Sequence, residues 1–383
     1  MRKVKTKPVI GMVAHHCCIR VYKEAKVLIG LGYEVHLVTN RLTFGVEDFV
    51  TVSYFNSVTQ LHNAIKHRPE VDIWHVHNEP DWLVEQTLAA ALPHQGVIFD
   101  VHDFESARWQ STPFQEQKIM RQVDACVHVS VPMNALALEI YGIYAPPSIV
   151  LPCHVPEAWY VNTKAEYHNN VVYEGGLDTP YKGAKEGPRG PEISFRDYGL
   201  LFDAVVQAGF SMSVYPSNTT PPGTDTQYAQ YGVWVRPEVD YPSLMPTLSK
   251  YSWGIVGASA ESLLMHRAMP NKLFEYMAAG VPVIVFNADT AGQFVKQLGV
   301  GIVIPTLNSD IDSIRKHIVA SLKEQITLSA WQACKDKVMA VRRSWSMDAQ
   351  IGPLCELYDD VHLGVKKRGT RRLRATQGKA PKS

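Results

Sequence analysis

Short apolar runs alternate with amphipathic stretches along most of this sequence. Runs rich in valine, isoleucine and leucine that end in polar residues or glycine are typical of strands buried on both faces of a parallel sheet. Between these runs, apolar residues three and four positions apart predict helices that cover the sheet. The predicted strands are 8–14, 34–39, 72–77, 97–102, 125–130, 148–151, 171–174, 212–215, 253–256 and 282–286. The predicted helices are 22–31, 198–208, 244–249, 270–279, 294–297 and 311–324.

This alternation predicts an α/β protein with two doubly wound, Rossmann-like domains. The length of 383 residues exceeds the usual size of a single core, and 46% hydrophobic with 20% charged residues is ordinary globular composition. We expect a first domain over 1–160, a linker around 159–168 and a second domain over 170–342. A further segment, 343–364, and a tail, 365–383, complete the chain.

The segment 268–286, with the sequence AMPNKLFEYMAAGVPVIVF, carries the strongest local pattern. Pro270 suits the first turn of a helix, and Gly280 suits the position that ends it. The valine-rich run after Gly280 predicts a strand. Lys272 and Glu275 are three positions apart and so share a face of the helix, at an edge of a parallel sheet where such folds bind nucleotides. The alternative is a solvated pair on the helix surface.

The stretch PNKLFEYMAAGVPVI resembles the donor-site signature of GT-B glycosyltransferases, in particular of the large retaining, family 4-like group that uses nucleotide sugars. The resemblance extends diffusely over residues 8–363. It implies two Rossmann-like domains facing a cleft, with the C-terminal helix expected at 343–364 crossing back to the first domain. It also implies that Glu275 holds the ribose hydroxyls of the nucleotide, and that Asn271 and Lys272 belong to the donor site.

A glycine pair follows the predicted strand 171–174. The chain lacks a G-x-G-x-x-G fingerprint after its first strand, which argues against a dinucleotide-binding dehydrogenase. Gly175 and Gly176 form a permissive loop instead, and the resemblance implies that this loop approaches the donor diphosphate, which basic residues beyond it neutralise. Arg196 is favoured because a helix opening there would add the positive potential of its N-terminus. Lys182 is second, because a Lys-Gly pair recurs at this place in the family. The alternative for each cation is an ordinary exposed position.

A second group of polar residues, DVHDFES at 100–106, follows a predicted strand of the first domain. Open sheets expose functional side chains at the carboxyl ends of their strands. The resemblance implies that His102 faces the donor sugar near its C6 hydroxyl, and we name His102 and Asp103 as candidate catalytic residues. Asp103 and Glu105 are also candidate acceptor contacts. The alternative for His102 is a structural histidine that bonds to a neighbouring carbonyl.

Other polar residues lie at the ends of strands in the same domain. His75 and His77 alternate along one strand and so point the same way. We expect them to pack near the interdomain cleft, with acceptor binding as the alternative. Arg20 and His15, near the end of the first strand, are assigned to the acceptor side. The alternatives for Arg20 are a contact to phosphate and a plain surface position.

The six cysteines show no CxxC pair and no metal-ligand spacing, so we expect free thiols and no metal site. Adjacent Cys17 and Cys18 would bind a metal with His15 and His16 only in an awkward geometry. No apolar run is long enough to span a bilayer, and none at the N-terminus resembles a signal peptide. A cytoplasmic location is therefore expected.

Net charge of +1 conceals an uneven distribution. The tail 365–383 holds eight lysines or arginines and no acid, which leaves 30 basic and 37 acidic side chains in residues 1–364. Because the tail also has few apolar residues, we expect it to be disordered. It is either a solubilising terminus or a contact to nucleic acid or to an anionic membrane.

The resemblance implies a glycosyltransferase that moves a sugar from a nucleoside-diphosphate sugar, with a UDP-sugar favoured, to a hydroxyl of an acceptor glycan, lipid-linked sugar or DNA base. The resemblance implies a retaining reaction in which the leaving phosphate assists deprotonation of the acceptor, so no general base, metal or other cofactor is expected. The alternatives are a sugar-nucleotide epimerase or hydrolase, a transferase acting on modified DNA bases, and a catalytically silent sugar-nucleotide or nucleic-acid binding protein. Arg267 favours the last, because the family usually has a glutamate eight positions before Glu275.

Overall fold

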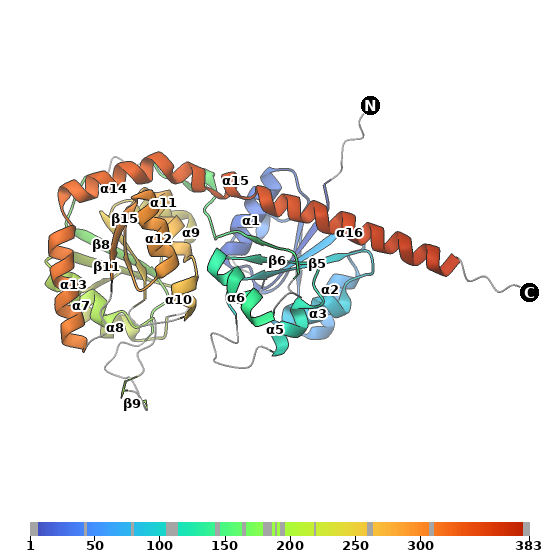
Figure 1. Cartoon of the computed structure of the whole chain (residues 1–383), viewed down its shortest axis with the longest axis horizontal. Coiled ribbons are helices and arrows are strands. Elements are labelled where there is room, and N and C mark those ends of the chain that lie inside the picture. Colours follow the sequence, from blue (N-terminus) through green and yellow to red (C-terminus); the bar gives the residue numbers. More distant parts are fainter. Residues whose placement is uncertain are drawn as a thin grey trace, which may run out of the picture. The chain divides into compact units, whose positions relative to one another are not determined.

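The chain forms two compact α/β units, each built around a parallel sheet (Figure 1). One unit comprises Met1–Pro152 with Met347–Ser383, and the other comprises Cys153–Ser346. The computed structural model describes residues 7–41, 44–77, 80–104, 114–141, 146–162, 166–178, 186–187, 190–191, 196–217, 220–258, 263–305 and 310–377. The α/β class and the two Rossmann-like sheets predicted from the sequence are confirmed.

The second unit begins earlier than the expected residue 170. Val155 belongs to its hydrophobic core, and Trp159, Tyr160 and Val161 pack against that core. The aromatic and branched side chains in this stretch explain the difference, since a polar linker would have had nothing to bury. The segment expected as a linker is therefore mostly part of the second unit.

The sheet of the first unit contains seven strands in the described part of the chain, all parallel, in the order β3-β2-β1-β4-β5-β6-β7. Strands β4 and β5 are buried along their whole length, as expected for central strands covered by helices. The strands are β1 Ile10–His16, β2 Val35–Arg41, β3 Thr51–Tyr54, β4 Ile73–His77, β5 Gly96–Val101, β6 Ala125–His128 and β7 Ser148–Val150. The α-helices are α1 Ile19–Gly30, α2 Val58–Lys66, α3 Trp82–Ala90, α5 Phe114–Met120, α6 Val131–Tyr141, α15 Met347–Gln350 and α16 Gly352–Gln377.

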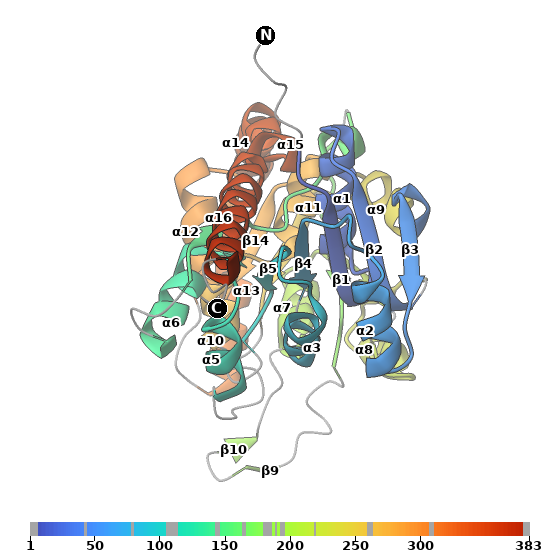
Figure 2. The same ribbon diagram turned by 90° about the vertical axis from the view of Figure 1, so that its right-hand side faces the viewer.

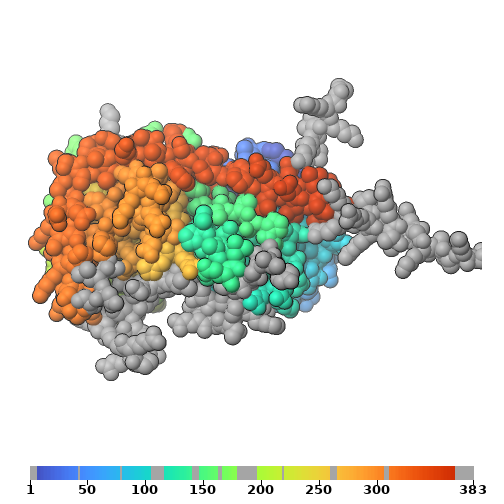
Figure 3. Space-filling view, viewed as in Figure 1, coloured from blue at the N-terminus to red at the C-terminus, as the bar shows by residue number. Residues whose placement is uncertain are grey.

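Helix α16 packs on this sheet along strands β4 to β7 (Figure 2). It forms a ridge on the surface of the unit in the space-filling view (Figure 3). Its buried face repeats every three or four residues, the spacing of one helical stripe. That face comprises Leu354, Leu357, Tyr358, Val361 and Val365.

The expectation of a disordered tail from residue 365 is wrong as far as Gln377, where α16 ends. The low apolar content suggested disorder, but lysine, arginine, leucine, alanine and glutamine are good helix formers. The packed part of α16 supplies the nucleus that an isolated basic segment would lack. In the described part of the chain, no helix combines the length and the apolar character needed to cross a bilayer.

The second unit has six parallel strands among its described residues, in the order β12-β11-β8-β13-β14-β15. The strands are β8 Asn170–Gly175, β11 Ser211–Pro216, β12 Trp234–Val235, β13 Trp253–Gly257, β14 Val283–Phe286 and β15 Gly301–Ile304. The α-helices are α7 Gly199–Gln207, α8 Thr224–Ala229, α9 Tyr241–Leu248, α10 Leu263–Arg267, α11 Asn271–Ala279, α12 Asp289–Leu298, α13 Ile311–Gln325 and α14 Leu328–Val341. A short antiparallel pair, β9 Glu186–Gly187 and β10 Gly190–Pro191, lies apart from this sheet.

The helix and strand predicted over 270–286 are confirmed as α11 and β14. Gly280 ends α11 in the left-handed conformation, with φ of 72°, which glycine adopts without steric cost. Pro270 is the N-cap of α11, one position before the first turn where we expected it. The aromatic ring of Tyr276 packs so closely on β13 that a Cβ on Gly254 would lie 2.6 Å from it, so this glycine permits the helix to approach the sheet.

Candidate functional site

A glycine loop and the start of a helix meet at the carboxyl end of β8 in the second unit. Gly175, the last residue of β8, has φ of +123°, a value that residues with side chains rarely adopt. A Cβ placed on Gly175 would lie 3.5 Å from Nζ of Lys272, in the first turn of α11. The same ammonium lies 5.0 Å from the centroid of the Tyr173 ring, within the range of cation–π attraction. Two predicted donor-site residues, distant in the sequence, are therefore neighbours.

The N-terminus of α11 adds positive potential beside Lys272. Pro270 caps the helix without a side-chain hydrogen bond, and the exposed Asn271 begins the first turn. Backbone N–H groups at the start of a helix attract anions. The carbonyl of Gly176 accepts a hydrogen bond of 2.9 Å from the hydroxyl of Tyr173, which fixes the glycine loop. The loop, the ammonium and the helix end together form a place suited to a diphosphate.

Glu275 lies one turn further along α11 and is only 3% exposed. Its Oε1 accepts a hydrogen bond of 2.8 Å from the hydroxyl of Tyr241, the first residue of α9. Burial, and then the charge of Glu275, hold the pKa of Tyr241 well above its usual value, so the phenol stays protonated and donates. Tyr241 thus orients the carboxylate. No local sequence pattern marks this partner, because Tyr241 belongs to another helix.

Arg196 lies beside the glycine loop, although not at the start of a helix as expected. Helix α7 begins at Gly199, because the carboxylate of Asp197 accepts a hydrogen bond of 3.0 Å from the N–H of Gly199 and so fixes the start of the helix there. The carbonyl of Arg196 accepts a hydrogen bond of 3.1 Å from the N–H of Asp178, just after the glycine pair. Lys182 lies outside the described residues.

In the first unit, a cluster of ionisable side chains is buried near the carboxyl ends of β4 and β5. Asp100 is fully buried, and both its oxygens accept hydrogen bonds from Nε of Arg20, at 3.0 and 3.1 Å. Nη2 of Arg20 lies 3.1 Å from Oε1 of Glu24 on the same helix, and Nη1 donates to the carbonyl of Leu151 at 2.9 Å. Arg20 is only 2% exposed. The alternative of a plain surface position for Arg20 is therefore wrong, because its guanidinium is bonded inside the fold, and its assignment to the acceptor side stays a prediction.

Three histidines extend this cluster from Asp100 toward the surface. The rings of His75 and His77 are stacked with centroids 4.5 Å apart. Nε2 of His75 and Nδ1 of His77 lie 3.3 and 3.5 Å from Oδ2 of Asp100. Nδ1 of His75 is hydrogen-bonded to the hydroxyl of Tyr358 on α16 at 2.7 Å. Nε2 of His102, whose side chain is 18% exposed, lies 3.2 Å from Nδ1 of His77. His75 and His77 are both buried within the first unit.

The cluster holds opposite protonation states on its two carboxylates. Burial holds the pKa of Glu24 well above its usual value, so this group is protonated. Burial would also raise the pKa of Asp100, but Arg20 and the neighbouring histidines outweigh it and hold that pKa well below its usual value. Burial, and then the proximity of His75 and His102, lower the pKa of His77 well below its usual value, so His77 is neutral. One arginine therefore balances one carboxylate.

The same residues include a set of metal-ligand types. Atoms of Glu24, His75, His77 and Asp100 lie within 4.8 Å of one another. The guanidinium of Arg20, however, lies within about 3 Å of both carboxylates, where it would repel a divalent cation. The donor set therefore fits an internal ion-pair network better than a metal site.

Comparisons with known proteins identify the fold. No protein-family model matches the sequence, and no curated protein sequence matches it. Among solved structures, sucrose-phosphate synthase from Thermosynechococcus elongatus has a TM-score of 0.66 at 13% identity, covering 94% of this chain and 100% of that one. HepE of Anabaena in complex with UDP and glucose has a TM-score of 0.63 at 10% identity, covering 96% and 100%. An alpha-glucosyltransferase in complex with UDP and a 13-mer DNA containing an HMU base has a TM-score of 0.61 at 13% identity, covering 92% and 100%.

The chain has the GT-B fold. Its two parallel sheets, with the strand orders of the two units, are the Rossmann-like halves of that fold. The second GT-B unit carries the loop-and-helix site of Gly175 and Lys272. The first GT-B unit carries the buried cluster around Asp100.

The remaining candidates of the first GT-B unit lie near the ends of two of its strands. His15 is half-buried near the end of β1, and burial, then the charge of Arg41, lower its pKa. Asp103 is half-buried and follows β5 directly after His102. Since β1, β4 and β5 are parallel neighbours, His15, Asp103 and His102 share one edge of the sheet. Glu105 lies outside the described residues.

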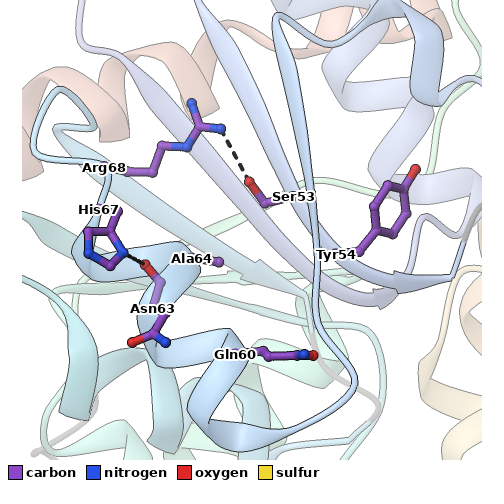
Figure 4. Close-up of a pocket in the computed structure, with 7 residues that line it drawn as sticks. All are labelled: Ser53, Tyr54, Gln60, Asn63, Ala64, His67 and Arg68. Atoms are coloured by element: carbon purple, nitrogen blue, oxygen red, sulfur yellow. Dashed lines mark hydrogen bonds between the residues drawn. The ribbon is translucent and has the colours of Figure 1, made fainter.

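A shallow polar hollow of about 410 Å³ lies elsewhere on the first unit, between β3 and α2 (Figure 4). Its polar groups are partly engaged with one another, since Arg68 donates to the hydroxyl of Ser53 at 3.2 Å and His67 bonds to the carbonyl of Asn63 at 2.9 Å. It contains none of the predicted site residues. We therefore assign it no role in the proposed function.

Acid should destabilise the first unit through His128. Burial lowers the pKa of His128 from 6.5 to about 4, whereas the unfolded chain protonates near 6.5. The unfolded state thus binds the proton first, and stability contributed by this group is lost as the pH falls from about 6.5 to about 4, on the order of 3 kcal/mol in total. In urea titrations at pH 7 and pH 4.5, His128→Met should lose less free energy of unfolding than the wild type. His94→Gln, at an exposed histidine, is the control and should follow the wild type; equal losses in all three proteins would contradict the prediction.

Proposed function

We propose that this protein is a glycosyltransferase that moves a sugar from a nucleoside-diphosphate sugar, preferably a UDP-sugar, to an acceptor hydroxyl. The observation that carries the proposal is the contact of Lys272 with the Gly175 loop, with Glu275 one turn along the same helix. The GT-B fold supports it, and so do neighbours of similar fold whose structures contain UDP.

In this proposal the second unit binds the donor. The carboxylate of Glu275 accepts hydrogen bonds from the two ribose hydroxyls, and Tyr241 holds it in place. Lys272, the N-terminus of α11, Arg196 and Lys182 bind the diphosphate. When the glycosidic bond breaks, negative charge grows on that diphosphate, so fixed positive groups lower the barrier more than they tighten ground-state binding.

The first unit contributes His102 and Asp103 to the sugar and acceptor. The reaction is proposed to retain configuration, with the departing phosphate taking the acceptor proton. Such a route depends on stabilising phosphate charge and excluding water, which the residues above supply without a metal. Asn271, His15 and Glu105 are the further proposed contacts.

A donor screen tests the proposal as a whole. The protein is incubated with UDP-, GDP- and ADP-sugars, with and without a panel of glycan, lipid-linked and DNA acceptors, and products are read by mass spectrometry. Slow release of free nucleotide without an acceptor, and faster release with one, is the expected result. Binding of nucleotide sugars without turnover under any of these conditions would favour the silent binder instead.

Removing the ammonium of Lys272 should weaken UDP binding. Lys272→Ala is expected to raise the Kd for UDP roughly ten- to a hundredfold at low salt, because one charge-assisted contact to a phosphate is worth about 1.5–3 kcal/mol. Lys250→Ala, at an exposed lysine of the same unit, should leave the Kd unchanged. Isothermal titration calorimetry at two salt concentrations measures both. Equal affinities of the two variants would remove Lys272 from the site.

A second candidate, within the same class of reaction, is glycosylation of modified bases in DNA. Two observations favour it: a neighbour of similar fold was solved with DNA containing an HMU base, and α16 continues as a helix into the basic segment. Phosphate contacts from this segment would position DNA without reading its sequence.

Charge removal tests this second candidate. Four glutamines in the basic segment should weaken retention on duplex DNA and reduce the slope of log K against log salt by about 0.9 for each phosphate that is no longer neutralised. Four glutamines at exposed lysines of the second unit should change neither. The substituted residues are Arg368, Arg371, Arg372 and Arg374 in the first variant, and Lys250, Lys316, Lys323 and Lys337 in the control. Identical salt profiles would count against DNA as the acceptor.

A further inference from the structure

The tautomer of His77 follows from its surroundings. This imidazole is neutral and fully buried, so it carries one proton. Its Nε2 has no hydrogen-bond partner in the part of the chain that the structure describes, and a proton there would be a buried, unsatisfied donor. Its Nδ1 faces Oδ2 of Asp100 at 3.5 Å and Nε2 of His102 at 3.2 Å. A lone pair at Nδ1 would point at the carboxylate, so the proton belongs on Nδ1.

Asp100 can impose this choice because its charge is fixed. Arg20 binds both of its oxygens. Nε2 of His75 lies 3.3 Å from Oδ2 of Asp100, the oxygen that also faces His77. Asp100 is therefore an ionised acceptor that draws the Nδ1 proton of His77 toward itself.

The proton on His77 then decides the state of His102. Two N–H groups cannot face each other across 3.2 Å, so Nε2 of His102 must present its lone pair to Nδ1 of His77. A neutral His102 consequently carries its proton on Nδ1. We propose that Asp100 and His77 are positioning residues that hold His102 as the neutral Nδ1–H tautomer.

This inference deepens the proposed function and rests on it for its consequence. With Nε2 held to His77 and the proton on Nδ1, His102 would meet a sugar hydroxyl as a hydrogen-bond donor and not as a base. That role agrees with a reaction in which the leaving phosphate takes the acceptor proton. This role also gives a reason for the buried ion pair of Arg20 and Asp100 behind His102.

Nitrogen NMR of the whole protein measures the tautomer without any substrate. The chain is labelled with ¹⁵N-histidine, and His102 is assigned by comparison with His102→Gln. Long-range proton–nitrogen correlations distinguish a protonated from an unprotonated ring nitrogen. A protonated Nδ1 and an unprotonated Nε2 in His102 is the expected result, and the reverse assignment overturns the proposal.

Two variants of equal size separate the effect of His77 from mere packing. Asparagine places its amide nitrogen where Nδ1 of histidine lies, whereas leucine has the same shape without a donor. His77→Asn should keep the Nδ1–H tautomer of His102, and His77→Leu should lose it. His77→Leu should also lower kcat roughly ten- to a hundredfold while the Kd for UDP stays unchanged. The same tautomer in both variants would remove His77 from the proposal.

The outcomes remain distinguishable from a failure of the proposed function. If the protein turns over no nucleotide sugar, the function fails while the NMR result still decides the tautomer. If a variant does not fold, the wild-type spectrum alone decides it. A wild-type protein that is active with His102 in the Nε2–H form would leave the function standing and refute the inference.

Discussion

Glu275→Gln should lower kcat/KM for the nucleoside-diphosphate sugar by roughly 10²- to 10⁴-fold. The substitution keeps the volume of the side chain but replaces a charged acceptor with a neutral amide. Two ribose hydroxyls would each lose a bond to a charged group, worth about 1.5–3 kcal/mol apiece, which corresponds to that range of rates. Steady-state kinetics, with UDP affinity from calorimetry, measure the loss.

Two companion variants make the result specific. Tyr241→Phe keeps the carboxylate and removes only the hydroxyl that orients it at 2.8 Å, so it should cost about tenfold or less. Glu238→Gln, at an exposed glutamate of the same unit, should cost nothing. Turnover by Glu275→Gln at the wild-type rate would remove the central element of the proposed donor site.

Asp100→Asn should destabilise the first unit by roughly 3–5 kcal/mol, the usual cost of removing one partner of a buried ion pair. The variant leaves the Arg20 guanidinium inside the protein, where it is 2% exposed, without its counter-charge. Because two units can unfold separately, the loss is best read from hydrogen exchange of peptides that cover β4 and β5.

Two controls distinguish the loss of a buried ion pair from the loss of a charge as such: a substitution in an exposed ion pair, and a double variant that removes both buried charges. Asp312→Asn breaks a bond of 2.9 Å to Arg315 at a side chain that is 75% exposed, and should cost less than about 1 kcal/mol. Removing both charges, with Arg20→Met and Asp100→Leu together, should cost less than Asp100→Asn, since no buried charge remains unpaired. A small effect of Asp100→Asn would mean that the cluster is not held by this pair.

Sequence patterns predicted best the strands at the centre of each sheet. Strands such as β4, β5, β13 and β14 are buried on both faces, so their apolar runs are unmistakable. Sequence patterns did not predict β3, β12 and β15. β3 is an edge strand of half-exposed, mostly polar residues, and β12 has only two residues. The short GIVI run of β15 lies between two helical segments and was not recognised as a strand.

The features of the candidate site also differ in whether the sequence could predict them. The contact of Lys272 with Gly175 follows from two motifs that each lie on a strand or helix end, so a sequence can place both. The burial of Arg20 could not be predicted from the sequence, because its partner Asp100 lies 80 residues away and no local pattern marks a buried arginine. Tyr358 is 283 residues from His75, and only the folded chain brings them together.

The position of helix α16 in the sequence determines when the first unit can complete its folding during synthesis. Residues Met1–Pro152 are synthesised before Leu354, Tyr358 and the neighbouring residues that cover the sheet they form. At about 5–20 residues per second, the intervening Cys153–Ser346 takes on the order of tens of seconds to synthesise. Until α16 is synthesised, the sheet of the first unit therefore exposes to solvent the apolar surface that α16 later covers. We expect chaperones to bind the nascent chain at this surface.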